Sequence, residues 1–278
     1  MTFRTFISTT VFTAGLLAAP VFAQSANGDL DRLYEVLQLD AVTEIMQQEG
    51  TRYGATIGED MFPDRLDGEW DLAVAQIYDL ERMQDKVRAD FAQSLTDADI
   101  APILAYFETA PGQTFVTLEI SARRAMLDEA VKDASEDSAT IARADRTPRF
   151  QMIAEFIETN DLIEPNVVGA LNSNYAFYVG LMDGDAFGGD LSEDQILTDV
   201  WTQEPDIRAN STDWLFSFLL MAYDPMSDDD LADYIAFSKT DAGAAVNLAL
   251  FEAFDEMFEG ISYQLGRAAA DVMTAQDL

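Results

Sequence analysis

The sequence predicts an all-α fold with two related helical-bundle halves that arise from an internal repeat. Apolar residues recur at three- and four-residue spacing along most of the chain, a pattern typical of helices with one buried face. No run combines two-residue alternation with β-branched residues, as a half-buried strand would. One segment also occurs twice, at residues 95–112 and 226–243, which predicts that the two halves share a common plan.

Helices are expected early in the first half because apolar residues fall on one face. Residues 30–46 carry such a stripe, which includes Leu30, Leu33 and Leu37. Proline and glycine between residues 61 and 68 predict a loop. A further stripe runs from Trp70 to Phe91 and predicts either one long helix or two shorter ones.

The repeated segment matches at the positions where a helix has its strongest residue preferences. Six of its eighteen positions are identical and five more carry similar residues. Each copy starts with a hydroxyl residue that suits an N-cap, places an aspartate at the capping-box position and ends at a glycine. The motif residues are Thr96, Asp99 and Gly112 in the first copy and Ser227, Asp230 and Gly243 in the second. We expect each glycine to end its helix, so that residues 96–131 and 227–266 form helical hairpins.

The second half continues the helical pattern on both sides of its copy. Thr147-Pro148 marks the boundary between the halves, because the residue before a proline leaves helical geometry. Apolar stripes follow over residues 150–157 and 171–182, and Pro205 suits the first position of another helix. The expected organisation is a signal peptide at 1–23, a first helical half at 24–147 and a second at 148–278. Either each half has its own core or the two share one.

Both copies of the repeat resemble a bacterial family, the domain of unknown function 2059. The resemblance rests on an aspartate-rich cap, an aromatic residue after an alanine and a turn of the Thr/Ser-Pro-x-Gly type, over roughly fifty residues in each half. The chain departs from this turn at Ala110-Pro111-Gly112, and the second copy, Thr240-Asp241-Ala242-Gly243, lacks the proline. The resemblance implies export and helical structure. It implies no activity and therefore no catalytic residue.

The first 23 residues predict an export signal. Arg4 precedes an apolar stretch at residues 6–19, and Val21-Phe22-Ala23 forms a small-residue cleavage site. The stretch is shorter than the ~20 apolar residues of a membrane-spanning helix. We therefore expect cleavage near Ala23, a mature chain in the periplasm or secreted, and no membrane association afterwards.

The mature chain is strongly acidic. Removing residues 1–23 takes away Arg4 and no acid, so 15 basic and 51 acidic residues remain, a net charge of −36. Such a surface repels nucleic acid and anionic lipid, whose binding depends on lysine and arginine. The charge suits a salty medium, in which ions screen repulsion. It could also attract basic partners or divalent cations.

Histidine and cysteine are both absent, which limits the available chemistry. Their absence excludes Ser-His-Asp and Cys-His machinery and the usual zinc and haem ligands. No catalytic residue and no cofactor are expected. Paired carboxylates could hydrolyse a glycoside, but among 51 acids close pairs arise by chance. A carboxylate-based hydrolase is therefore an alternative and not the first expectation.

One glycine-rich acidic loop suggests a weak calcium site. Its candidate ligands are Asp183, Asp185 and Asp190. The first two and Gly188 fit positions one, three and six of an EF-hand loop, whereas Phe187 and Asp194 do not suit positions five and twelve. The competing interpretation is an acidic loop before a helix capped by Ser192, with Gln195 closing a capping box. We favour that interpretation.

Three other groups of residues have both a functional and a structural interpretation. Acidic residues gather at the repeated caps: Asp97, Asp99, Asp228, Asp229 and Asp230. The arginines that stand out are Arg123, Arg124, Arg143, Arg146 and Arg149. Aromatic stripes contain Tyr175, Tyr178, Trp214, Phe218, Phe251, Phe254 and Phe258.

We favour the structural interpretation of each group. The acids suit helix N-termini, although they could form a cation site or a docking face for a basic partner. The arginines could bind an anion, but they more simply pair with acids of the other half, so that Arg146→Glu would loosen the halves. The aromatic residues form core, although they could line an apolar ligand cavity.

These observations predict an exported, all-helical binding or interaction protein without catalysis. Its partner is an unknown protein or small molecule. The alternatives are a carboxylate-based hydrolase and a carrier of a small apolar ligand or Ca²⁺.

Overall fold

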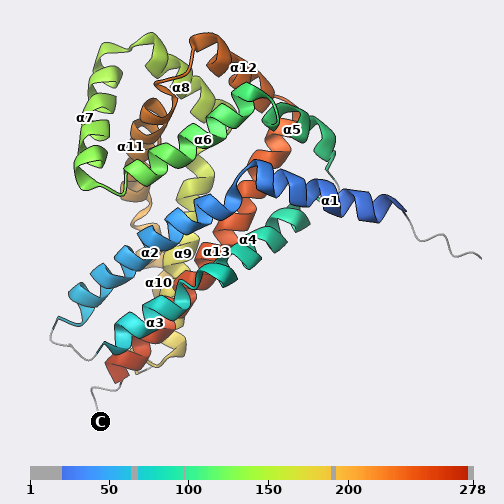
Figure 1. Ribbon diagram of the computed structural model, residues 1–278. Coiled ribbons are helices and arrows are strands. Elements are labelled where there is room, and N and C mark those ends of the chain that lie inside the picture. Colours follow the sequence, from blue (N-terminus) through green and yellow to red (C-terminus); the bar gives the residue numbers. More distant parts are fainter. Residues whose placement is uncertain (1–20, 64–67, 97, 189–191, 275–278) are drawn as a thin grey trace, which may run out of the picture.

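The computed structural model is all-helical over the residues it describes, which are 21–63, 68–96, 98–188 and 192–274 (Figure 1). Side chains are described from residue 28 onward. No strand occurs within these ranges, so the prediction of an all-α fold is confirmed. The apolar stretch of the expected signal peptide lies outside them. Within the same ranges, no helix combines the length and apolar character needed to cross a bilayer.

The apolar stripes form helices, as their periodicity predicted. The stripe from Trp70 to Phe91 forms two helices, because Asp79 caps a new one with a hydrogen bond from the Arg82 amide (2.9 Å). The helices are α1 (Val21–Val36), α2 (Leu39–Met61), α3 (Glu69–Ile77), α4 (Leu80–Ser94), α5 (Ile100–Phe107), α6 (Ala110–Ala125), α7 (Glu129–Asp145), α8 (Pro148–Thr159), α9 (Ile163–Asp183), α10 (Glu193–Trp201), α11 (Glu204–Tyr223), α12 (Asp228–Ser238) and α13 (Asp241–Thr274).

Several helix starts lie where the sequence placed them. Thr147 caps α8, with Pro148 in its first turn, and Ser227 caps α12 by accepting a hydrogen bond from the Asp230 amide (3.1 Å). Ser192 and Gln195 form the predicted capping box of α10. At these sites the capping residue directly precedes the helix, which is why local sequence identifies it.

The predicted cap of the first copy was wrong. Thr96 donates a hydrogen bond to the carbonyl of Gln93 (2.8 Å) at the end of α4. The N-cap of α5 is Asp99, whose carboxylate accepts a hydrogen bond from the amide of Ala101 (3.2 Å). Asp99 directly precedes the apolar stripe, and aspartate caps a helix as well as a hydroxyl residue does.

The prediction that the two motif glycines end their helices was wrong. Both lie in the first turn of the helices that follow. The Thr109 hydroxyl accepts a hydrogen bond from the Gly112 amide (3.1 Å), and the Thr240 hydroxyl accepts one from the Gly243 amide (3.1 Å). A Cβ at either glycine would collide with the main-chain oxygen of the residue six positions earlier. Glycine is needed because the preceding helix end approaches this closely.

A second pair of turns also has matching geometry. Gln38, between α1 and α2, and Asp161, between α8 and α9, both adopt the left-handed conformation, with φ of 53° and 46°. The amide of each bonds to the carbonyl three residues earlier, at 3.0 and 3.1 Å. The connection from α1 to α2 therefore has the same local geometry as that from α8 to α9.

The buried core crosses the expected boundary at residue 147. The largest cluster joins α1–α6 and one residue of α9 to α13 at the end of the chain. A second cluster joins Phe115, Ala122 and Ala139 of α6 and α7 to α8, α11 and α12. A small third cluster lies between α9 and α10. Of the two alternatives left open by the sequence, the shared core is the one the described residues adopt.

The long helix α13 organises this packing. It runs along the molecule from α5 and α12 towards the end where α3 lies, while α7, α8, α11 and α12 gather at the opposite end (Figure 1). Along its length α13 packs most extensively on α9, and also on α4 and α3. The α9–α13 seam therefore positions side chains from the middle and the end of the chain together.

Candidate functional site

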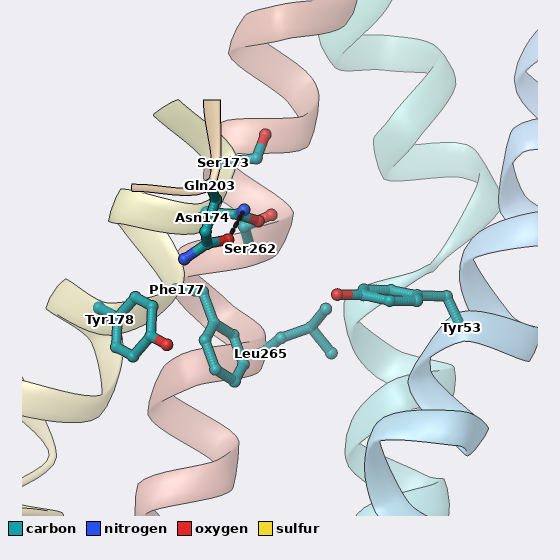
Figure 2. Close-up of a pocket in the computed structure, with 8 residues that line it drawn as sticks. All are labelled: Tyr53, Ser173, Asn174, Phe177, Tyr178, Gln203, Ser262 and Leu265. Carbon is teal, nitrogen blue, oxygen red and sulfur yellow. Dashed lines mark hydrogen bonds between the residues drawn. The ribbon is translucent and has the colours of Figure 1, made fainter. Parts of the chain in front are cut away.

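A pocket of about 260 Å³ opens beside the α9–α13 seam. Its lining comes from α2, α9, the residue before α11, and α13 (Figure 2). The eight lining residues are Tyr53, Ser173, Asn174, Phe177, Tyr178, Gln203, Ser262 and Leu265. This volume lies just below the usual range for drug-sized ligands, which indicates a small occupant.

Small residues explain why the seam is tight at its ends and open in its middle. A Cβ at Gly169 would collide with the Asp255 carboxylate, and one at Gly180 would collide with the main chain of α13. A Cβ at Gly266 would similarly collide with the Phe177 carbonyl. At Gly180 and Gly266 glycine thus lets the two backbones touch, whereas at Gly169 it leaves room for the Asp255 carboxylate. Between these contacts α9 carries larger side chains, and the helices leave room.

The pocket lining is rich in uncharged hydrogen-bonding groups. The Asn174 amide donates to the Gln203 side-chain carbonyl (2.9 Å), which fixes the orientation of both amides (Figure 2). The hydroxyls of Ser173, Ser262 and Tyr178 make no hydrogen bond with other described residues. None of the eight lining residues carries a charge. The pocket therefore offers donors and acceptors without a strong preference for an ion.

Tyr53 forms one side of the pocket opening. It projects from α2 with its hydroxyl towards Leu265 on the opposite wall (Figure 2). The residue is 58% exposed, whereas Leu265 is buried. Partial burial, and then the nearby Tyr178, raise the pKa of Tyr53. The phenol therefore stays protonated at neutral pH and can donate a hydrogen bond, while its ring offers a flat surface for stacking.

An acidic group lies further along the same seam. Asp255 is two helical turns from Ser262 on α13, about 10 Å along the helix axis. Burial, followed by Glu259 and Glu256, raises the pKa of Asp255 to about 6. The end of the seam beside the pocket is therefore electronegative at neutral pH, which disfavours an anionic occupant.

A second unusual group lies in the core between α6, α11 and α12. The Glu119 carboxylate accepts a hydrogen bond from the Tyr223 hydroxyl (2.5 Å), and burial raises the pKa of Glu119 to about 7. Burial likewise raises the pKa of Tyr234 and Tyr106, with Glu119 contributing to both. The Tyr106 hydroxyl has no hydrogen-bond partner among the described residues. This cluster can hold or release one proton near neutral pH.

The structure does not assemble the predicted calcium ligands into a described site. Asp183 ends α9, where its carboxylate accepts a hydrogen bond from Tyr263 (3.0 Å). Asp185 adopts a left-handed conformation in the following turn, and Asp190 lies outside the described residues. Within the described ranges, no three acidic side chains converge as metal ligands would.

The acidic motif residues serve helix ends. Asp99 caps α5, and Asp228, Asp229 and Asp230 occupy the first turn of α12, where the helix dipole favours negative charge. Asp97 lies outside the described residues. The structural interpretation therefore accounts for those that are described.

Three of the five predicted arginines form ion pairs with described acids, and one of these pairs joins the two halves. Arg143 reaches Asp213 of the second half (2.8 Å). Arg123 pairs with Glu49 within the first half, and the partner of Arg149 is Asp228, within the second. Arg146 ends α7 in a left-handed conformation and makes no ion pair with another described residue. Among the described residues, Arg143 rather than Arg146 therefore joins α7 to α11 by an ion pair.

The aromatic stripes are mostly core. The rings of Trp214 and Phe218 stack at 4.9 Å beside the second cluster, and Phe254 and Phe258 pack against the first. Tyr175 donates a hydrogen bond to Glu193 at the surface (2.7 Å). Tyr178 is the residue of the predicted aromatic set that lines the pocket.

Comparison with known proteins places one part of the chain. Residues 81–139 match the family model described as an uncharacterized protein conserved in bacteria (DUF2059). The matched stretch covers α4, α5, α6 and most of α7, and so contains the first copy of the repeat and Glu119. No curated protein and no solved structure matches the chain.

Sequence reasoning missed both the pocket and Glu119. Seven of the eight pocket residues are distributed among α2, α9, the start of α11 and α13 without a local motif, and only Tyr178 belonged to a candidate set. A cluster of serine and asparagine on the apolar α9, at Asn172, Ser173 and Asn174, was the one local signal. Glu119 has none, since it is one acid among 51.

Proposed function

We propose that the chain is an exported binding protein whose pocket takes a small uncharged ligand with several hydroxyl or amide groups. The observation that carries this proposal is the pocket lining. It combines free hydroxyls, an oriented pair of amides and exposed aromatic surface with no charged side chain. Ligand sites of this kind use a few placed polar groups for orientation and apolar surface for affinity.

The alternatives have less support at this site. A small apolar ligand would leave the pocket's hydroxyl and amide groups without partners, which costs free energy when water is displaced. A carboxylate-based hydrolase needs two carboxyl groups about 5–10 Å apart around its substrate. The lining residues of the pocket include no aspartate or glutamate. A sugar-like or amide-containing molecule fits the pocket chemistry better than either alternative.

Native mass spectrometry tests this function on protein purified from its own periplasm. We expect a bound small molecule of a mass compatible with the pocket, and a rise in melting temperature when that molecule is added. Ser262→Leu fills the pocket and should abolish both effects. Ser138→Leu makes the same change at an exposed position of α7 and should abolish neither. Absence of any bound molecule, together with no response to a panel of sugars, polyols and amides, would contradict the proposal.

Export is part of the same proposal. The positively charged start, the short apolar stretch and the Val21-Phe22-Ala23 site support a cleaved signal peptide. N-terminal sequencing of the protein from a periplasmic fraction should begin near Gln24. Recovery of the intact chain from the cytoplasm would contradict this expectation.

We also propose that the mature chain consists of two related halves. Supporting this are the repeated sequence, the matching Thr–Gly hydrogen bonds before α6 and α13, and the matching left-handed turns before α2 and α9. On this view α1, α2, α4 and α5 correspond to α8, α9, α11 and α12, and α6 with α7 corresponds to the single long helix α13. A structure-based superposition of the two sets tests the correspondence.

A further inference from the structure

We infer that the two halves are exchanged, so that each supplies helices that complete the other's core around a local two-fold axis. This inference rests on the two-half organisation proposed above and extends it to how the halves associate. In this arrangement the single chain resembles a dimer of two related units in which the second unit is covalently joined to the first.

The helix pairing carries the inference. In chain order α4 precedes α5 and α6, just as α11 precedes α12 and α13. Yet α4 packs on α13 of the second half and not on α6. Reciprocally, α11 packs on α6 and α7 of the first half and not on α13. The equivalent helices α4 and α11 thus each pack on a helix of the other half. Two unrelated domains that merely touch would not show this reciprocal pairing.

Individual contacts show the exchange on the α4 side. Val87 of α4 and Met257 of α13 are both buried and belong to the same core cluster. Lys86 on α4 approaches Glu256 on α13 (3.6 Å) at the edge of this contact. The core of the first three-helix segment, α2 to α4, is therefore closed by the last helix of the chain.

Reciprocal contacts occur on the α11 side. Tyr223 of α11 donates its hydrogen bond to Glu119 of α6, and its ring meets Phe115 of the same helix edge-on at 5.1 Å. Further along, Asp213 of α11 forms its ion pair with Arg143 of α7. Helices of the first half therefore close the core of the second.

A contact between equivalent residues locates the two-fold axis. Tyr106 and Phe237 occupy the same position in the two copies of the repeat, 131 residues apart. Their rings stack at 4.0 Å with planes 8° apart. In an isologous association, a residue meets its own equivalent only beside the two-fold axis. The stack between α5 and α12 therefore marks the centre about which the halves exchange.

The exchange has a functional consequence for the pocket. Tyr53 comes from the first half, whereas the other seven lining residues come from the second. The first half reaches this position because α3 and α4 both pack directly on α13, and α2 packs on α3 and α4. The pocket is therefore complete only when the halves are exchanged.

Amide hydrogen exchange, measured on the full chain, tests the inference with two core substitutions. One substitution lies at the contact of α13 with α4, and the other at the contact of α11 with α6 and α7. Met257→Ala removes a buried side chain of α13 and should accelerate amide exchange in α4 by about 30-fold, while α11 stays unchanged. Leu219→Ala in α11 should accelerate exchange in α6 and α7 and leave α4 unchanged. Leu248→Ala, at an exposed position of α13, is the matched control and should change neither.

The opposite pattern would overturn the inference. If Met257→Ala accelerates amide exchange in α11 and spares α4, the halves are related but not exchanged, and the proposed two-half organisation stands without the exchange. Uniform acceleration of every helix would show one cooperative unit without reciprocal modules, and would also overturn it.

A nicked full-length protein provides a measurement that needs no core substitution. A protease site inserted between Arg146 and Thr147 cuts the exposed connection of α7 to α8. Exchanged halves should remain a 1:1 complex in native mass spectrometry until denaturant is added. Separation into two folded monomers without denaturant would refute the exchange.

Discussion

The buried carboxyl of Glu119 makes the stability of this protein depend on pH in a specific direction. Burial raises the pKa of Glu119 from 4.5 to about 7 in the folded chain. An unfolded chain exposes this carboxyl to water. As the pH rises, the unfolded chain therefore loses the Glu119 proton at a lower pH than the folded chain does. The contribution of Glu119 to stability is therefore greatest below pH 4.5, falls between pH 4.5 and 7, and is constant above pH 7.

The substitution Glu119→Gln isolates this contribution. A neutral amide avoids the cost of burying a charge and can still accept the hydrogen bond from Tyr223. The difference between a pKa of 4.5 and one of about 7 corresponds to about 3 kcal/mol. We expect the variant to match the wild type near pH 4 and to exceed its free energy of unfolding by up to about 3 kcal/mol at pH 8.

Denaturant unfolding followed by circular dichroism, at several pH values between 4 and 8, measures this difference. Glu158→Gln removes an exposed carboxyl on α8 and controls for the loss of one negative charge. Its stabilisation should be small and should decrease as salt is added. A Glu119→Gln effect that is the same at every pH, or a variant less stable than wild type at pH 8, would refute the reasoning.

Three further predictions follow from the described contacts. Gly112→Ala and Gly243→Ala should each lower the free energy of unfolding by about 1–3 kcal/mol, because the added Cβ would collide with backbone atoms. Gly260→Ala adds a Cβ in open space and should raise the free energy of unfolding by up to about 1 kcal/mol. Thermal unfolding measures all three. A double-mutant cycle on Arg143 and Asp213 should give a coupling below about 1 kcal/mol that disappears in 1 M salt, since both side chains are exposed. The melting temperature should rise with NaCl, and a salt-insensitive value would contradict the role assigned to the acidic surface.

The local features of the fold were largely readable from the sequence. Apolar spacing predicted the helices, and the caps at Ser192 and Ser227 were identified because each is decided within one helical turn. The error at Thr96 has the same origin, since two residues three positions apart could both cap α5, and only the geometry at the end of α4 favours Asp99.

What the sequence could not provide depends on contacts distant along the chain. Gly112 reads as a helix terminator because glycine often ends helices. Its actual role follows from the approach of the α5 end to α6. The pocket likewise requires that Tyr53 meet α9 and α13, more than 100 residues further on. No periodicity within one helix reports which other helix it will contact.

The two matching left-handed turns allow the pocket to be compared with the equivalent region of the first half. Asp161 lies 123 residues after Gln38, so in the proposed two-half organisation Ser173 and Phe177 of the pocket would correspond to Gly50 and Gly54 on α2. At Gly50 a Cβ would collide with a tyrosine ring, and at Gly54 with Val74 of α3. The first half therefore closes this region by packing.

The contrast bears on why the pocket exists. If the two halves proposed above needed a gap at this position for packing, both halves would have one. Instead α3 fills the region in the first half, with Trp70 and Val74 buried, whereas α9 carries Ser173 and Asn174 and leaves its counterpart open. Open space lined by free hydroxyls gains nothing for folding, since it forgoes apolar burial of about 25 cal/mol per Å². A difference between the halves that lowers stability and adds hydrogen-bonding groups is what a ligand site acquired by the second half would produce.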